Sequence, residues 1–437
     1  MEGASLTTSP SRACCSGHCD SMNGDTAAAL ERRLPHSAPT PAHPTHIEQG
    51  TPAFRRTAVA LFLAGFSTFG LLYTVQPLLP EFSRHFGVTA ANSALALSLS
   101  TGLLAVMMLV AGLVSDRVGR RNVMISALLA STVLSGASAL VDDWTTLLVL
   151  RALLGVALSG VPAVAMTYLV EEMDSRAMGL AMGLYIGGNA VGGMSGRLIA
   201  GIVADHWGWR WGIGAVSLIA VAGTLLLWVQ LPASRHFHSR RGGLRGLPAR
   251  WRALFADPGL PWLFVTAFVL MGVFVTTYNY LGYHLLAPPY RLSQTVVGLI
   301  FSVYLVGTFS SAWMGQQAAR HGRGRVLSIS YGLIITGIVL LVLPWLGTMA
   351  IGIALLTFGF FGAHSVASSW VGSRAGANRA EASALYLFAY YLGSSVLGVT
   401  GGFAYTAWGW TGVCAFTGAL SLIGIGIARR LWRRDPA

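Results

Sequence analysis

Long apolar segments alternate with short polar segments along almost the whole chain. Each apolar segment has about 20 residues, the length that a helix needs to cross the hydrocarbon core of a bilayer. Backbone polar groups find no partner in lipid, so such segments form helices whose hydrogen bonds are internal. The pattern predicts twelve membrane-spanning helices, over residues 57–79, 92–114, 122–141, 146–169, 177–203, 210–231, 261–286, 295–317, 326–345, 348–372, 381–406 and 410–431.

The composition agrees with this pattern. The chain is 54% hydrophobic and only 10% charged, whereas a soluble domain carries about 25% charged residues. The 53 glycines would weaken soluble helices, but in a membrane they let neighbouring helices approach closely. The predicted fold class is therefore an all-α integral membrane protein.

The formal net charge of +13 is explained by topology. Every basic residue is an arginine, and only Arg84, Arg210 and Arg291 fall on one predicted side of the membrane. Apart from Arg151 and Arg197, which lie within helices, the other arginines fall on the opposite side. Because cytoplasmic loops are enriched in basic residues, both termini are predicted to be cytoplasmic, next to the anionic inner leaflet. No nucleic-acid partner is needed to explain the charge.

Two polar segments divide the chain. Residues 1–52 are rich in Ser, Thr, Pro and His and have no apolar core of a secretory signal, so we expect a disordered cytoplasmic tail. Residues 232–260 form a basic cytoplasmic linker, in which "ARWRALF" is expected to form a short interfacial helix. The predicted division is 1–52 tail, 53–231 N-terminal six-helix half, 232–260 linker, 261–431 C-terminal six-helix half and 432–437 tail.

Three cysteines in the tail, Cys14, Cys15 and Cys19, lie close to His18. These are residue types that bind zinc. Because the surrounding tail is predicted to be unstructured, we expect no metal site, and no cofactor is expected anywhere in the chain. The role of the cysteines stays open.

The two halves repeat one another at a shift of about 203–205 residues. "GLVSDRVGRRN" from Gly112 matches "GQQAARHGRGR" from Gly315, and Tyr73 matches Tyr278. Two six-helix halves related by such a parallel repeat describe a known transporter architecture.

The loop between the second and third predicted helices carries an unusual concentration of charge. Its pattern Gly-x-x-x-Asp-Arg-x-Gly-Arg-Arg resembles the signature loop of the major facilitator superfamily. The resemblance implies a twelve-helix monomeric carrier in which this loop is a cytoplasmic latch. It implies that Asp116 meets the N-terminus of the eleventh helix, where Glu381 attracts the arginines. The gating residues are Gly112, Asp116, Arg117, Gly119, Arg120, Arg121 and Glu381.

The fourth and fifth predicted helices extend this resemblance. "RALLGVALSGVPAVAMTYLVEE" is similar to the family's helix 4 motif, and "LYIGGNAVGGMSGR" resembles the antiporter motif of drug:proton antiporters through Gly188, Gly192 and Gly193. Asn189 stands where that motif has Pro. The sequences of several helices are similar to those of putative bacterial inner-membrane transporters that are grouped with arabinose-efflux-like permeases. The glycine spacing also predicts a helix-packing surface.

Ionisable residues inside a membrane are functional candidates. No Asp or Glu falls in the middle of a predicted helix, which leaves Arg151, Arg197 and His364 as candidates for coupling. The arginines either reach the outer surface or form a cationic vestibule, with Asp142 and Asp205 as partners at its edge. His364 is either a structural histidine or a proton site.

The resemblance also implies that helices 1, 4, 7 and 10 surround a central cavity. The polar and aromatic residues expected to contact cargo are Tyr73, Gln76, Tyr278, Asn279, Tyr283, Trp370 and, from helix 11, Tyr390. Tyr and Trp near helix ends are also common at membrane interfaces, so Gln76 and Asn279 are the stronger candidates.

The predicted function is secondary active transport of a small molecule across the bacterial inner membrane by alternating access, with proton-coupled export as the leading hypothesis. An uptake carrier or facilitator for sugars or organic acids is the alternative. The sequence has no phosphate-binding loop for ATP and no catalytic dyad in its helices, so an enzyme is not expected.

Overall fold

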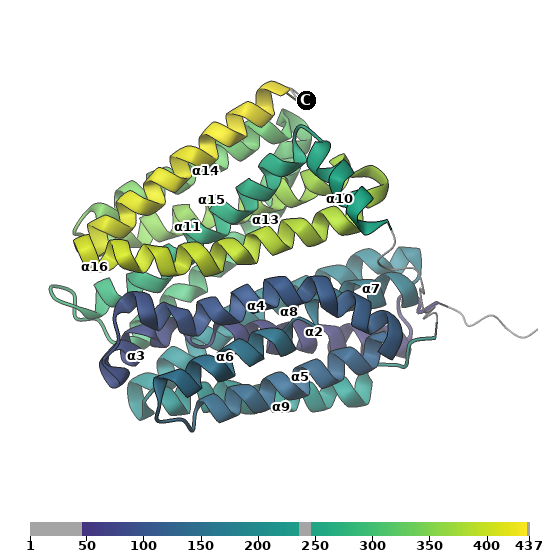
Figure 1. Cartoon of the computed structure of the whole chain (residues 1–437), viewed down its shortest axis with the longest axis horizontal. Helices are drawn as coiled ribbons and strands as arrows, with labels where there is room; N and C mark the ends of the chain where they lie inside the picture. The colour runs from purple at the N-terminus through teal and green to yellow at the C-terminus, as the bar shows by residue number, and fades with distance from the viewer. Residues whose placement is uncertain (1–45, 236–245, 435–437) are drawn as a thin grey trace, which may run out of the picture. The chain divides into compact units, whose positions relative to one another are not determined.

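The computed structural model describes residues 46–235 and 246–434, and nearly all of these residues are helical (Figure 1). The elements of the first half are α2 (Pro52–Tyr73), η1 (Gln76–Leu78), α3 (Leu79–Phe86), α4 (Ala90–Val118), α5 (Arg120–Ser138), α6 (Trp144–Leu158), α7 (Pro162–Glu172), α8 (Ser175–Trp207) and α9 (Trp209–Gln230). After α10 (Leu247–Ala256), the second half contains α11 (Leu260–Leu286), α12 (Gln294–Leu299), η2 (Ile300–Val303), α13 (Tyr304–His321), α14 (Arg323–Val342), α15 (Leu346–Arg374), η3 (Gly376–Asn378) and α16 (Arg379–Arg434). The all-α prediction is confirmed.

Every predicted apolar segment falls mostly on helix in the described part of the chain. Nine helical stretches there are long and apolar enough to cross a membrane. One of them, Gly376–Arg434, contains two predicted segments, which are separated by the non-helical Gly409. The twelve crossings and the cytoplasmic termini stay predictions.

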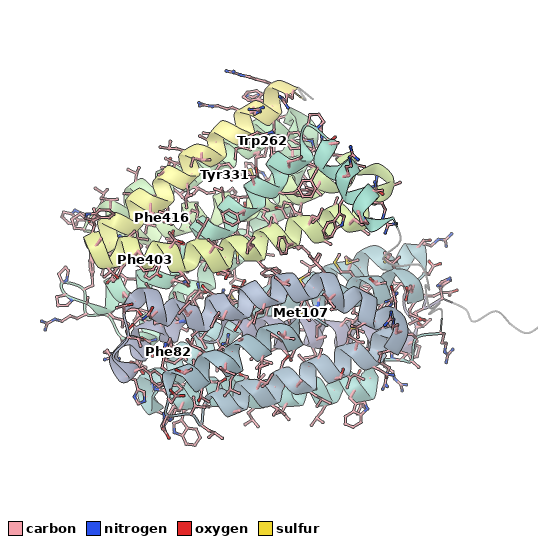
Figure 2. All side chains as sticks on the ribbon, viewed as in Figure 1. Phe82, Met107, Trp262, Tyr331, Phe403 and Phe416 are labelled. Carbon is pink, nitrogen blue, oxygen red and sulfur yellow. The ribbon has the colours of Figure 1, made fainter. Side chains whose placement is uncertain are left out.

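Large apolar side chains cover the outer surface of the helices as well as the interior (Figure 2). Leu218 is 71% exposed, Val133 70% and Phe403 64%. Exposing so much apolar surface to water is energetically unfavourable, whereas contact with lipid is favourable. These side chains are therefore placed as a lipid-facing surface requires.

Three predicted segments are interrupted, which the apolar pattern did not show. The first breaks after Tyr73 and continues through η1 into α3, and the eighth is divided by η2. The fourth breaks between α6 and α7, where Pro162 takes the first position of α7. Proline is tolerated there because its missing N–H would have no helical partner. The prediction of single helices over 57–79, 146–169 and 295–317 was wrong in this respect.

Side-chain caps set several helix starts. Thr51 Oγ1 accepts a hydrogen bond from the N–H of Phe54 at the start of α2, and Asp143 caps α6. Just before α2, the N–H of Ile47 donates to the carbonyl of Glu172 over 2.8 Å. The predicted disorder of residues 1–52 therefore does not extend to residues 47–52, while residues 1–45 lie outside the described part.

Four glycine turns reproduce the repeat in the backbone. Gly119, with φ +96°, separates α4 from α5, and Gly322, with φ +85°, separates α13 from α14. Gly208, between α8 and α9, and Gly409, inside α16, also have positive φ, and each stands between two tryptophans. Positive φ favours glycine, so both halves turn at equivalent places for the same reason.

The glycines of α8 form a close seam with α2. A Cβ added at Gly188, Gly192 or Gly196 would lie closer than 3.0 Å to the backbone of α2, a separation that real Cβ atoms essentially never show. Gly187, on another face of α8, has no such neighbour within 4 Å. The glycine spacing in the sequence thus marks the face on which α8 packs.

We expect Gly192→Ala to lower the stability of the protein by about 1–3 kcal/mol, because the new methyl group overpacks the seam. Gly187→Ala is the matched control and should be neutral or slightly stabilising, because alanine favours helix. Thermal unfolding of both variants in detergent measures the difference. Equal melting temperatures for the two variants would contradict the tight seam.

Candidate functional site

The side chain of Arg197 lies in the interior, where only 2% of its residue surface is exposed. Its Nε donates to Gln76 Oε1 over 2.6 Å, and one terminal nitrogen donates to the carbonyl of Gly193 over 2.7 Å. The guanidinium carbon lies 4.0 Å from the ring centre of Tyr73 and 5.0 Å from that of Tyr304. Aromatic faces attract cations, so neutral groups surround this charge.

Gln76 connects this arginine to the other half of the chain. Its Nε2 donates to Asn279 Oδ1 over 2.8 Å, across 203 residues of sequence. Gln76 belongs to the first half and Asn279 to the second, and both are buried, so this contact joins the halves in the interior, where a central cargo site is expected.

Two buried polar atoms next to this chain of hydrogen bonds lack a partner among the described residues: Asn279 Nδ2 and the hydroxyl of Tyr304. Buried polar atoms are nearly always paired, and an unpaired one needs an explanation. Water or a bound polar molecule would satisfy either atom. Together with Arg197, they offer donors to a ligand with acceptor oxygens.

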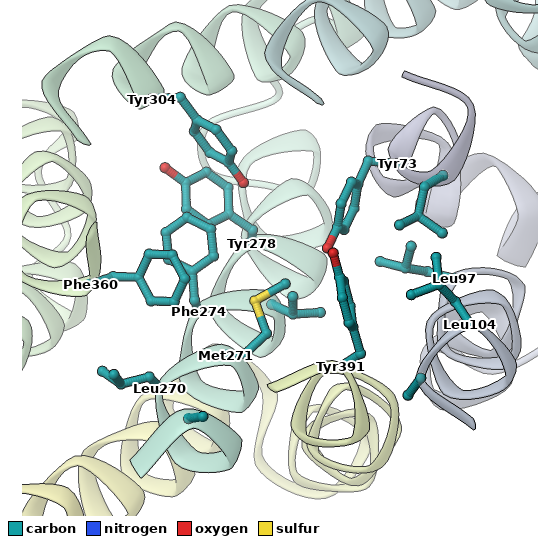
Figure 3. Close-up of a cluster of buried hydrophobic side chains, with 14 of the residues drawn as sticks. Tyr73, Leu97, Leu104, Leu270, Met271, Phe274, Tyr278, Tyr304, Phe360 and Tyr391 are labelled. Carbon is teal, nitrogen blue, oxygen red and sulfur yellow. The ribbon is translucent and has the colours of Figure 1, made fainter. Parts of the chain in front are cut away.

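Aromatic residues surround this region (Figure 3). The hydroxyl of Tyr278 lies 2.8 Å from Thr357 Oγ1, and its ring stacks on Phe301 with centres 5.2 Å apart. Phe274 and Phe360 stack with centres 3.8 Å apart. Figure 3 shows Tyr73 from α2 pointing toward Tyr391 from α16. The structure thus brings together Tyr73, Gln76, Tyr278, Asn279 and Arg197.

Arg151 has a different environment from Arg197. It is 0% exposed, and its three guanidinium nitrogens donate to the carbonyls of Ala96, Leu71 and Leu72, at 2.9, 3.1 and 2.6 Å. The last carbonyls of a helix have no helical donor, and α2 ends directly after Leu72, at Tyr73. A cation also complements the helix dipole there, so Arg151 stabilises the interruption of the first segment.

Both arginines are buried, and neither reaches the outer surface. The predicted alternative in which they do so was wrong. The proposed edge partners were wrong as well. Asp142 pairs with Arg210 in the outer loop. Asp205 instead accepts hydrogen bonds from the N–H and Oγ1 of Thr295.

His364 belongs to α15, and its side chain faces α16. Its Nδ1 is 3.0 Å from the hydroxyl of Tyr386, and its ring centre is 4.7 Å from that of Tyr390. Tyr390 therefore belongs to the surroundings of His364. His284, near the end of α11, stacks on Trp410 with ring centres 5.0 Å apart.

The two halves are joined by contacts at the ends of the helices that are predicted to lie outside. The hydroxyl of Tyr283 donates to the carbonyl of Leu79 over 2.8 Å and lies 2.6 Å from Ser83 Oγ. Thr295 Oγ1 donates to Asp205 Oδ2 over 2.6 Å. Tyr283, predicted to contact cargo, thus belongs to an interhalf contact.

The signature loop lies at the opposite ends of the helices. Arg120 is 4% exposed in its side chain and pairs with Asp116 at 2.6 Å and with Glu171 at 2.9 Å. Arg121 donates to the carbonyls of Leu231 and Trp228 at the end of α9. Gly119, with φ +96°, makes a tight turn, and Gly112 has no neighbour within 4 Å of a Cβ added there. Arg117 is exposed.

The predicted partner of Glu381 also differs. Glu381 pairs with Arg250 of α10 at 2.8 Å rather than with the arginines of the signature loop. Close by, Arg374 Nε donates to Asp257 Oδ1 over 2.7 Å. Burial raises the pKa of the Asp257 carboxyl, but hydrogen bonds from Arg374, Leu260 N–H and Gly259 N–H outweigh burial and leave this pKa below its ordinary value. The latch of Asp116 on the eleventh helix is not formed in this conformation.

The remaining predicted residues are placed as follows. Asn189 Oδ1 is buried without a partner among the described residues, near Gly65 of α2. Gly193 lies beside the Arg197 guanidinium, and Trp370 is 2% exposed on α15. Cys14, Cys15 and Cys19 lie outside the described residues, and no group of metal-ligating side chains occurs within 46–235 and 246–434.

Sequence reasoning missed Tyr304 and the contact between Asp205 and Thr295. Tyr304 lies well inside the predicted segment 295–317, where it is one of several aromatic residues, and nothing in its neighbours distinguishes it. Asp205 was expected to pair with a buried arginine, because charge was the only available signal. The sequence did contain the Ser293 cap of α12, which marks the helix start that Asp205 meets.

We expect Arg151→Gln to lower the free energy of unfolding by about 3 kcal/mol or more, because it leaves buried carbonyls at the end of α2 without their charged donor. Arg210→Gln, which removes an arginine from the partly exposed outer loop, should have little effect. Thermal unfolding in detergent compares them. A variant at position 151 that is as stable as the unchanged protein would contradict the role of Arg151.

Comparison with known proteins agrees with this architecture. The sequence profile of the Major Facilitator Superfamily matches residues 61–288 and 280–437. The chain is 46% identical over 388 residues to the inner membrane transport protein YnfM of Escherichia coli, covering 89% of this chain and 93% of the relative. It is 43% identical over 389 residues to the uncharacterized MFS-type transporter YybF of Bacillus subtilis, covering 89% and 96%.

Solved structures show the same fold at low sequence identity. The nucleoside transporter NupG superposes with a TM-score of 0.72 at 15% identity, covering 86% of this chain and 100% of that chain. A bacterial homolog of the human lysosomal transporter Spinster, in an inward-facing and occupied conformation, also gives 0.72 at 16% identity, covering 88% and 98%. The protein is a multi-pass transporter of small molecules in the bacterial inner membrane, not an enzyme, and it belongs to the major facilitator superfamily.

Proposed function

We propose that this transporter exports a small molecule by alternating access, driven by the proton gradient, and that it works as a monomer. The observation that carries the proposal is the hydrogen-bond chain from Arg197 through Gln76 to Asn279. It combines a buried cation, unpaired donors and an interhalf contact in one place. A cargo that binds there contacts both halves and thereby affects their relative movement.

The distribution of contacts supports an inward-open state. The halves are joined near Tyr283 and Asp205, on the predicted outer side. On the predicted inner side, Asp116 pairs within its own half and Glu381 pairs with α10. In the opposite state, the inner ends would approach each other, and Asp116 would then be free to meet the start of the eleventh helix. In this proposal, the signature loop is a latch that holds the inner ends of the two halves together in the opposite state.

His364 is our candidate for proton coupling. Histidine is the side chain whose ordinary pKa lies closest to physiological pH, and His364 sits within the helices, in contact with two tyrosines of α16. In the described part of the chain, no Asp or Glu lies in the middle of a spanning helix. A proton carried by His364 would add a charge between α15 and α16 and change their packing.

The alternative is an uptake carrier or facilitator for sugars or organic acids. One observation favours organic acids: among the described residues, the buried Arg197 contacts neutral groups and aromatic faces. A carboxylate cargo would supply the missing negative charge. In that case, no proton site is needed to explain the buried charge.

Transport in proteoliposomes separates these functions. The full chain is reconstituted under an imposed pH gradient and offered a library of drugs, sugars, amino acids and organic acids, and the trapped compounds are identified by mass spectrometry. Accumulation that a protonophore abolishes supports proton-coupled export. Equilibration of a compound regardless of the gradient supports a facilitator and contradicts proton coupling.

For the compound that is found, we expect His364→Gln to abolish proton-driven accumulation while gradient-independent exchange of the compound across the membrane continues. The reason is that glutamine is polar but does not take up a proton near neutral pH. His284→Gln is the matched control, and it should retain accumulation. If His364→Gln accumulates the compound as the unchanged protein does, another group couples transport to protons.

A further inference from the structure

A groove runs along the lipid-facing side of the first spanning helix, between α2 and α8. Its volume is about 550 Å³. The side chains along most of its length are apolar: Phe54, Val59, Phe62, Leu63, Leu180 and Leu184. Leu180 and Leu184 are 46% and 37% exposed, so the groove is open to the surroundings of the helices.

The groove is continuous with a basic pocket at the start of α2. This pocket has a volume of about 640 Å³ and is lined by Arg55, Arg56 and Gln230, together with the turn before α2. Arg55 and Val59 line both depressions. A single site therefore begins with two arginines at the end of the helix and continues into apolar surface toward its middle.

The two arginines are available to a ligand. Both are exposed, and neither side chain forms a hydrogen bond or ion pair with the described residues. In the second half, two arginines at the end of α16 do have partners. Arg430 lies over the Trp262 ring at 4.5 Å, and Arg434 donates to the carbonyl of Pro258. The pocket there is lined by four arginines and Gly426 and has no apolar extension.

We propose that this site binds an anionic phospholipid, with the phosphate at Arg55 and Arg56 and an acyl chain along Val59, Phe62 and Leu184. Guanidinium groups bind phosphate oxygens through paired hydrogen bonds. The apolar part lies where a spanning helix meets hydrocarbon, so the ligand has both a charged and an apolar end. A soluble phosphate would use only the basic pocket and leave the groove empty.

The site lies on two helices that also carry residues of the candidate cargo site. The groove is bordered by α2 and α8, the helices that carry Tyr73 and Arg197 and that pack through the glycine seam. A lipid that bridges these helices supports the seam from outside. This proposal does not depend on the direction of transport or on proton coupling.

Native mass spectrometry of the full chain in detergent tests the proposal. The protein is titrated with phosphatidylglycerol or with phosphatidylcholine of the same acyl chains, and with inorganic phosphate alone. We expect tighter binding of phosphatidylglycerol, and little retention of phosphate. Because each arginine at an anionic surface contributes a factor of about five, Arg55→Gln/Arg56→Gln should weaken phosphatidylglycerol binding about 25-fold.

Two further variants separate this site from general attraction to a basic surface. Arg252→Gln/Arg325→Gln removes the same charge from exposed positions elsewhere and should leave binding unchanged. Leu180→Trp fills the groove without changing the charge and should weaken the binding of both lipids, while thermal unfolding checks that each variant is folded. The proposal is overturned if both lipids bind equally, if phosphate alone binds as tightly, or if the two double variants behave alike.

Discussion

A positive charge buried between helices must be balanced by its surroundings, and the arrangement around Arg197 follows from this constraint. An isolated charge in a medium of low polarity is very costly, so its guanidinium is held by amide and carbonyl oxygens and by aromatic rings. The amide that accepts from it, Gln76, has its own donor directed at Asn279 in the other half. The charge and the contact between the halves therefore belong to one network, and a ligand that alters one alters the other. The second buried arginine, Arg151, is balanced by backbone carbonyls at the end of α2 and positions the helix end from which Gln76 follows.

The repeat supplies the framework for this network. Equivalent glycine turns, such as Gly119 and Gly322, return the chain in the same way in each half, and the halves then meet through Gln76 and Asn279. A contact between the halves is suited to a carrier, because a rocking movement about the central axis changes the outer and inner contacts in opposite directions. The signature loop is tied to its own half, because Arg120 pairs with both Asp116 and Glu171 there.

Much of this fold could be predicted from the sequence, since spanning helices require long apolar segments and a tight turn requires glycine. The face of α8 that carries Gly188 and Gly192 was also predictable, because small residues at a spacing of four mark close helix contacts. The break after Tyr73 was not predictable, because it is stabilised by Arg151, about 80 residues away, whose partners are carbonyls that every residue possesses. The partners that Asp116 and Glu381 have here were not predictable, because the resemblance describes a latch between the halves, whereas Asp116 pairs with Arg120 and Glu381 with Arg250.

The distance between the outer ends of the two halves tests the central claim most directly. Spin labels at positions 84 and 291, both in predicted outer loops, would be introduced into a chain whose four native cysteines have been replaced. The Arg197–Gln76–Asn279 network predicts a short and narrow distance distribution in the otherwise unchanged protein and a shift to longer distances in Gln76→Leu. Gln316→Leu, at an exposed position of α13, serves as the control and should leave the distribution unchanged. A distribution in Gln76→Leu identical to that of the unchanged protein would show that the network does not hold the outer ends together.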